Sequence, residues 1–147
     1  MASFDGVDVD ITVQKLDCGD YSLEGLEHIF GLERKATTGE LYLNLGQLKM
    51  KERFHRELAL LDKVKHAYII CEFPECRIHM FPDNSGIPER RKKFLRISAK
   101  YFSKLIYEIR DMYDIEIIFC ENREEAEKIT IGLLKEMWDK YGGDISS

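Results

Sequence analysis

Hydrophobic and polar residues alternate near the start of the chain, and this alternation predicts β-strands. In the segment over residues 7–16, Val7, Val9, Ile11 and Val13 alternate with polar residues, which is typical of a half-buried strand. Shorter strands are expected over residues 21–23 and 29–36, separated by a glycine-containing turn. The second of these is expected to be the returning strand of a hairpin.

Further along the chain, segments with helical spacing of apolar residues alternate with short apolar runs that predict buried strands. The expected elements are a helix over residues 49–64, strands over 67–73 and 77–81, a loop over 82–88, a helix that follows this loop and ends near Met112, a strand over 115–120, and a helix that Asn122 caps and Gly142 ends. This order predicts an α/β fold with a central mixed β-sheet flanked by helices.

The composition is that of an ordinary globular domain. The 147 residues are 44% apolar and 33% charged, which excludes disordered and collagen-like chains. No apolar run approaches the roughly 20 residues of a membrane span, and residues 1–6 lack the features of a secretory signal. The four cysteines are too scattered for a disulfide framework or a zinc site. We therefore expect one intracellular domain over residues 1–147, in the cytoplasm or the nucleus.

Charge is distributed unevenly along the chain. The formal net charge is −5, yet residues 34–104 contain 16 Lys and Arg against 8 Asp and Glu. Because binding follows the local potential, DNA is a plausible partner for this basic middle region. The candidate DNA contacts are Arg53 and Arg56 on the first expected helix, and Arg90, Arg91, Lys92 and Lys93 in a basic run. A solvated helix surface explains either group equally well.

Charged residues at the ends of two expected strands are candidates for catalysis. Glu33 and Lys35 are two residues apart on one strand and project from the same face, with Arg34 opposite. A hairpin partner can bring Asp20 beside Glu33, and two carboxylates suit Mg²⁺ or Mn²⁺. A neighbouring lysine can orient a metal-bound water and stabilise charge on a phosphate. From spacing alone, a solvated strand end is the more frequent explanation of these residues.

The segments CGDYSL and GLERKATTGEL, at residues 18–23 and 31–41, resemble the G-D-x(n)-E-R-K-x(3)-D signature of XPF-type nuclease domains. These domains belong to the restriction-endonuclease-like PD-(D/E)xK group, and the resemblance extends over about residues 7–138. It implies that Asp20 and Glu33 bind the metal and that Lys35 acts on the attacking water. It also implies that Arg34 contacts phosphate or braces the site.

The sequence departs from this family pattern at three places. The family's Asp-x-Arg-Glu strand has no counterpart before residue 7, and Asp5, Asp8 and Asp10 are unassigned substitutes. The aspartate four residues after the lysine falls on Gly39, and Glu40 is the candidate additional acid. We expect no counterpart of the family's C-terminal helix-hairpin-helix domain within residues 1–147.

The resemblance implies a Mg²⁺-dependent endodeoxyribonuclease that acts on branched or structured DNA, with Mn²⁺ as the alternative ion. A homodimer or heterodimer is expected because related domains pair, and no membrane partner is expected. The alternative is a catalytically silent member of the fold that binds DNA or a partner subunit. A sequence-specific restriction enzyme is a weaker third option. Glu72 is either a third site acid or half of a structural salt bridge.

Overall fold

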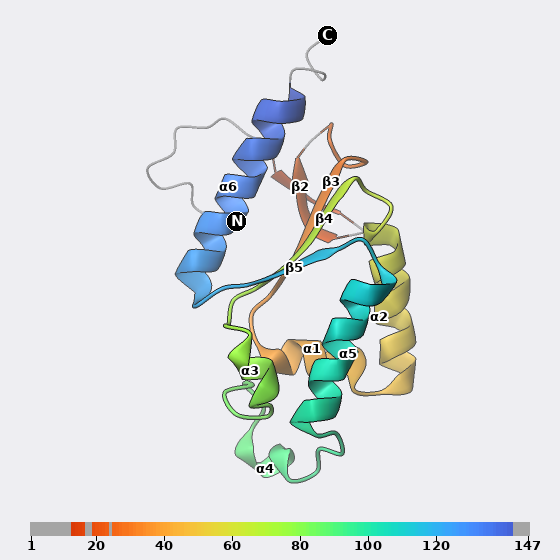
Figure 1. The fold of residues 1–147 in the computed structure, drawn as a ribbon, viewed down its shortest axis with the longest axis vertical. Helices are drawn as coiled ribbons and strands as arrows, with labels where there is room; N and C mark the ends of the chain where they lie inside the picture. The colour runs from red at the N-terminus through yellow and green to blue at the C-terminus, as the bar shows by residue number, and fades with distance from the viewer. Residues whose placement is uncertain (1–12, 17–18, 24, 143–147) are drawn as a thin grey trace.

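The computed structural model describes residues 13–16, 19–23 and 25–142, and these residues contain a 5-stranded sheet. Its strands lie side by side in chain order: β1 (Val13–Leu16), β2 (Gly19–Leu23), β3 (Phe30–Lys35), β4 (His66–Cys71) and β5 (Glu116–Phe119). β1 pairs with β2, and β2 with β3, in antiparallel orientation, whereas β3, β4 and β5 run parallel. Figure 1 shows this sheet between the helices.

The predicted α/β class is confirmed, and the description of the sheet needs one correction. The core of the sheet is parallel rather than mixed, because β3, β4 and β5 are joined by helical crossovers. Antiparallel pairing is confined to the β1–β2 and β2–β3 pairs. The strand predicted over residues 7–16 is described only from Val13 onward, and its earlier part lies outside the described residues.

The helices agree with the sequence patterns in part. They are α1 (Thr38–Leu45), α2 (Leu48–Leu61), α3 (Cys76–His79), α4 (Glu89–Lys92), α5 (Ala99–Met112) and α6 (Arg123–Tyr141). Helices α2, α5 and α6 were expected, although the basic run forms the separate helix α4 instead of the start of α5. The expectation of a strand over residues 77–81 is wrong: Ile78 and Phe81 are buried with helical spacing, and the residues between them are exposed.

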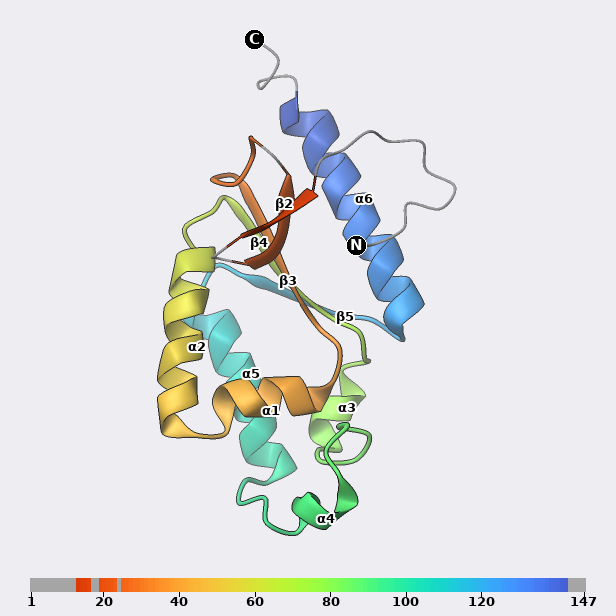
Figure 2. The ribbon, with the colours of Figure 1, turned by 180° about the vertical axis from the view of Figure 1, so that it is seen from behind.

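Side chains alternate across the parallel strands, and each face of the sheet therefore has its own core. Ile69, Cys71 and Ile117 pack with α1, α2 and α5 on one face. Phe30, Leu32 and Ile70 pack on the other face against α6, whose Ala126, Leu134 and Met137 are buried. The views in Figures 1 and 2 show α6 on one side of the sheet and α2 and α5 on the other. Strands covered on both faces explain the continuous apolar runs.

The loop between α3 and α4 packs tightly against the first turn of α1. The Gly39 amide donates a hydrogen bond to the Ser85 carbonyl oxygen at 3.0 Å. A Cβ atom added to Gly39 would lie 2.4 Å from that oxygen, which is too close for a side chain. The close approach of two backbones therefore requires glycine at position 39.

We predict that Gly39→Ala lowers the free energy of unfolding by about 1–3 kcal/mol, because the loop must move to admit the methyl group. Chemical denaturation measures this change. The matched control is Gly132→Ala in α6, where an added Cβ would meet nothing within 4 Å. The control should be neutral or stabilising by up to about 1 kcal/mol through helix propensity. Equal effects of the two substitutions would contradict the close packing at Gly39.

Candidate active site at the end of β3

The last residues of β3 bring Glu33 and Lys35 together on one face of the sheet. The Lys35 Nζ atom lies 3.2 Å from the Glu33 Oε1 atom, and their side chains are 10% and 14% exposed. The spacing of two residues on a strand produces this juxtaposition, as the sequence predicts. The explanation as a solvated strand end is wrong, because parallel pairing with β4 places these charges inside the fold.

Helix α2 holds the lysine in place through an aromatic ring that the sequence analysis did not assign to the site. The Lys35 Nζ atom lies 5.1 Å from the centroid of the Phe54 ring, and Phe54 is itself fully buried. A cation over an aromatic face is attracted by the ring quadrupole, and the aliphatic part of the lysine can pack on apolar surface. Phe54 thus directs the ammonium group back toward Glu33.

The pairing of β2 with β3 places position 20 next to this pair. Tyr21 is the partner of Leu32 in the antiparallel register. Because partners in an antiparallel pair move in opposite directions, continuing this register by one residue sets Asp20 opposite Glu33. The description of β2 is limited to its backbone. The hairpin arrangement expected from the sequence is therefore present at the level of the backbone.

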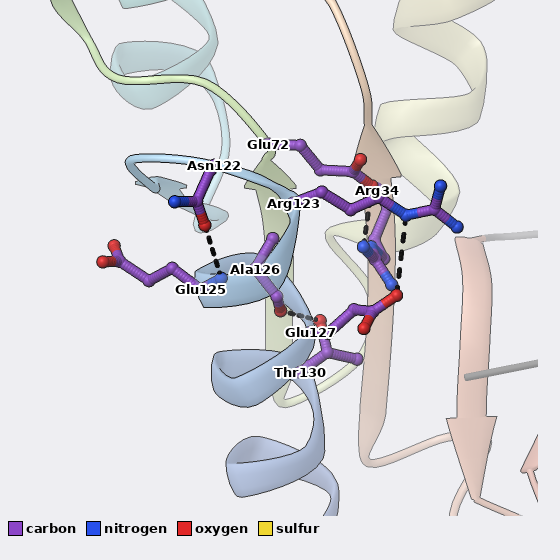
Figure 3. A network of polar contacts seen from close by, with 8 residues as sticks. All are labelled: Arg34, Glu72, Asn122, Arg123, Glu125, Ala126, Glu127 and Thr130. Atoms are coloured by element: carbon purple, nitrogen blue, oxygen red, sulfur yellow. Dashed lines mark hydrogen bonds and ion pairs between the residues drawn. The ribbon is translucent and has the colours of Figure 1, made fainter. Parts of the chain in front are cut away.

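Arg34 projects to the opposite face and forms an ion pair there with Glu72. The Arg34 Nη2 atom lies 2.7 Å from the Glu72 Oε2 atom, with the side chains 11% and 13% exposed. Figure 3 shows this pair near the start of α6, where the Asn122 side chain accepts a hydrogen bond from the Glu125 amide. Of the two explanations for Glu72, the structure shows the salt bridge. Arg34 is placed to brace the strand end from behind the Glu33–Lys35 pair.

Glu40 is the additional acid suggested by the sequence, and it lies in the first turn of α1. Its side chain is exposed, and its amide donates a hydrogen bond to the Thr37 side chain at 3.3 Å, which caps the helix. Gly39 stands at the position of the family aspartate. The Ser85 carbonyl leaves no space there for a larger side chain. Glu40 is therefore offset from the position that the family signature uses.

The candidate DNA-binding residues lie on two separate helices. Arg53 and Arg56 are exposed on α2, and Arg53 lies 3.6 Å from Glu57 in an exposed pair. Arg90 and Arg91 are exposed on α4 and Lys93 directly after it, whereas the Lys92 ammonium contacts Glu89 at 2.6 Å. Figure 2 shows α1 between α2 and α4. The structure thus places these cations on both sides of the helix that follows Lys35.

Several other polar groups that the sequence offers have structural roles. Burial raises the pKa of the Cys71 thiol, with Cys120 adding to the effect and Lys35 opposing it, so Cys71 stays protonated in the core. His55, His66 and His79 each share a hydrogen bond with a tyrosine hydroxyl. Within the described part of the chain, no three His, Cys, Asp or Glu side chains are grouped to hold a metal ion.

Among the comparisons with known proteins, only the comparison of structures finds a match. No protein-family model matches this sequence, and no curated protein sequence matches it. The structure is similar to XPF from Aeropyrum pernix, with a TM-score of 0.54 and 17% identity over 84% of this chain and 53% of that chain. XPF from Aeropyrum pernix in complex with DNA gives a TM-score of 0.53 and 15% identity, over 83% and 50%.

These similarities confirm that the chain has an XPF-like fold, as the sequence indicates. The match spans about half the length of the solved chains. At this level of identity the likeness establishes the fold, whereas activity must be argued from the site itself. Among the described residues, no helix is long and apolar enough to cross a membrane.

We predict that Glu72→Gln lowers the free energy of unfolding by about 3 kcal/mol, because it removes the carboxylate that pairs with the mostly buried guanidinium of Arg34. Denaturant titration measures the loss. Glu57→Gln is the matched control, since its pair with Arg53 is 43% exposed at the glutamate and 65% at the arginine. That exposed pair should contribute less than about 1 kcal/mol. A small effect of Glu72→Gln would exclude a bracing role for the ion pair.

Proposed function

We propose that this chain is a metal-dependent endodeoxyribonuclease that hydrolyses phosphodiester bonds in branched or structured DNA. The observation that carries the proposal is the placement of Lys35, 8% exposed and 3.2 Å from Glu33 at the carboxyl end of β3. The carboxyl ends of parallel strands are the usual place for ligand binding in open α/β sheets. The XPF-like fold and the register of Asp20 opposite Glu33 support the same conclusion.

The residues present fit a hard divalent cation. Glu33 supplies carboxylate oxygens at a strand end, and Asp20 is the proposed second ligand from the neighbouring strand. Bound there, Mg²⁺ or Mn²⁺ would supply Lewis acidity for an attacking water and a phosphate oxygen. The ammonium of Lys35 orients that water and stabilises negative charge as it develops on the phosphate. Arg34 and Phe54 act by positioning, because they fix the strand end and the lysine.

A catalytically silent subunit that binds DNA or a partner is the second candidate, and the packing of Gly39 favours it. The acidic position of the family signature is filled by a glycine that the Ser85 carbonyl holds in place. A chain that lost this acid could keep the ion pairs of β3 for stability alone. The two candidates share the fold and differ in whether Lys35 acts on a phosphate.

Replacing Lys35 separates the two candidates. We expect Lys35→Met to reduce single-turnover DNA cleavage in Mg²⁺ about a hundredfold or more, roughly 3 kcal/mol, with DNA affinity retained. The methionine keeps the apolar stem against Phe54, so the variant should stay folded, and its melting temperature is measured alongside. Asp20→Asn and Glu33→Gln should abolish cleavage. Lys63→Met, at an exposed lysine after α2, is the control and should cleave at the wild-type rate.

Cleavage by Lys35→Met at the wild-type rate would remove the catalytic role from this lysine. A wild-type chain that cleaves no flap, duplex or single-stranded DNA in Mg²⁺ or Mn²⁺ would establish the silent subunit instead.

The basic helix α4 provides a test of DNA binding that does not depend on cleavage. Because each phosphate contact contributes about 0.9 to the salt dependence of binding, Arg90→Gln with Arg91→Gln should lower that slope by about 1–2. Binding is measured by fluorescence anisotropy over a salt series without divalent cations. Lys128→Gln with Lys135→Gln, at exposed positions of α6, is the control. An equal slope for both double variants would show that α4 does not contact phosphates.

A further inference from the structure

The segment from Arg90 to Lys104 is unusually basic and carries no compensating acid. It contains seven Lys and Arg residues and no Asp or Glu. Six of these basic residues are exposed, and the seventh, Lys92, pairs with Glu89 just before the segment. The segment links α4 to the first two turns of α5, so its charges follow one another closely along the chain. Such a surface attracts a polyanion.

Two large aromatic side chains are exposed within this basic surface. Phe94 is 71% exposed and Tyr101 is 46% exposed, whereas the neighbouring Phe102 is fully buried in the core. The Lys93 Nζ atom lies 5.2 Å from the centroid of the Phe94 ring. The core therefore does not account for Phe94 and Tyr101. Exposed aromatic rings among basic residues are a feature of surfaces that bind single-stranded nucleic acid.

A hollow on the outer face of α5 adjoins Tyr101 and extends this surface. It has a volume of about 590 Å³ and is lined near its start by Ser98, Lys100, Tyr101 and Lys104. Ser98, Tyr101 and Lys104 follow one another at steps of three residues, and Lys100 is four residues before Lys104, so these side chains lie toward one face of the helix. Tyr107, Glu108 and Asp111 line the part that lies further along α5, so the basic groups of the hollow are gathered at the amino-terminal end of the helix.

The same surface adjoins the helix that follows the candidate active site. Arg91 lines a groove with Thr37 and Glu40, at the start of α1 and just beyond Lys35. The loop before α4 is bonded to α1 through the Gly39 amide and the Ser85 carbonyl. A strand of nucleic acid on this surface can therefore continue toward the end of β3. In Figure 2, α4 lies below α1.

We propose that the surface from α4 to the first turns of α5 binds single-stranded DNA, with bases stacked on Phe94 and Tyr101 and phosphates held by the basic residues between them. Aromatic platforms within a basic track are how proteins hold unpaired strands without reading sequence. Duplex DNA does not offer this contact, because its base faces are already stacked on one another. The inference rests on the proposed function, and it deepens it by assigning an unpaired arm of the substrate to this surface.

Binding of an oligothymidine of about 12 nucleotides tests the proposal, since sites of this kind span roughly 4–16 nucleotides. Anisotropy is measured in EDTA, so that no cleavage occurs. We expect Phe94→Ala and Tyr101→Ala each to weaken binding about tenfold or more, while affinity for a duplex of the same length stays within about twofold. Tyr101→Phe keeps the stacking face and should bind like the wild type. Leu60→Ala, at an apolar residue 44% exposed on α2, is the control.

Three results would overturn the proposal: a wild-type chain that does not bind oligothymidine, alanine variants that bind it normally, or alanine variants that lose duplex and single strand equally. The nuclease proposal is judged separately by cleavage. If the wild type cleaves DNA and the alanine variants bind oligothymidine normally, the nuclease proposal stands and the proposed binding surface is rejected. If the wild type binds through Phe94 and Tyr101 but does not cleave, the binding surface stands and the nuclease proposal is rejected.

Discussion

Strand β3 is buried on both faces and ends in three consecutive charged residues, Glu33, Arg34 and Lys35. The fold must provide partners for these charges. Burying an ionised side chain costs free energy unless the charge is paired. The end of β3 is therefore stable only if partners for its charges lie on both faces of the sheet. On one side Lys35 is held by Glu33 and the Phe54 ring. On the other side Arg34 is held by Glu72, the residue that follows β4.

This requirement couples distant parts of the chain to the candidate site. Glu72 directly follows β4, Phe54 comes from α2, and the start of α6 lies beside the Arg34–Glu72 pair. The parallel register aligns Lys35 with Cys71, and Cys71 with Phe119, so the ends of the three core strands meet in one row. Packing of the two cores therefore fixes the direction of the charged groups as well as the stability of the sheet. A site built on strands in this way is more rigid than one built on loops.

The sequence predicts the helices whose periodic pattern extends over many residues and the strands that are buried on both faces. The apolar runs that became β4 and β5 were clear because helices cover both faces, whereas α1 was missed because it is only eight residues long. Its signal was present, since Thr37 and Glu40 have the spacing of a capping box and the Thr37 side chain caps the helix. The helix α3 was mistaken for a strand because four residues hold too little pattern to distinguish the two periods.

The sequence predicted the parts of the candidate site that depend on local spacing. The parts that it did not predict are contacts between residues far apart in the sequence. The two-residue period of a strand places Glu33 and Lys35 on the same face. No local pattern indicates that the Phe54 ring contacts Lys35 or that the Ser85 carbonyl lies against Gly39. The contact at Gly39 bears most directly on mechanism. An aspartate there would collide with the loop, so the first turn of α1 cannot supply an acid from that position. The proposed hydrolysis therefore relies on Asp20 of β2 and Glu33 of β3 rather than on position 39, and it assigns a larger share of the charge stabilisation to the ammonium of Lys35.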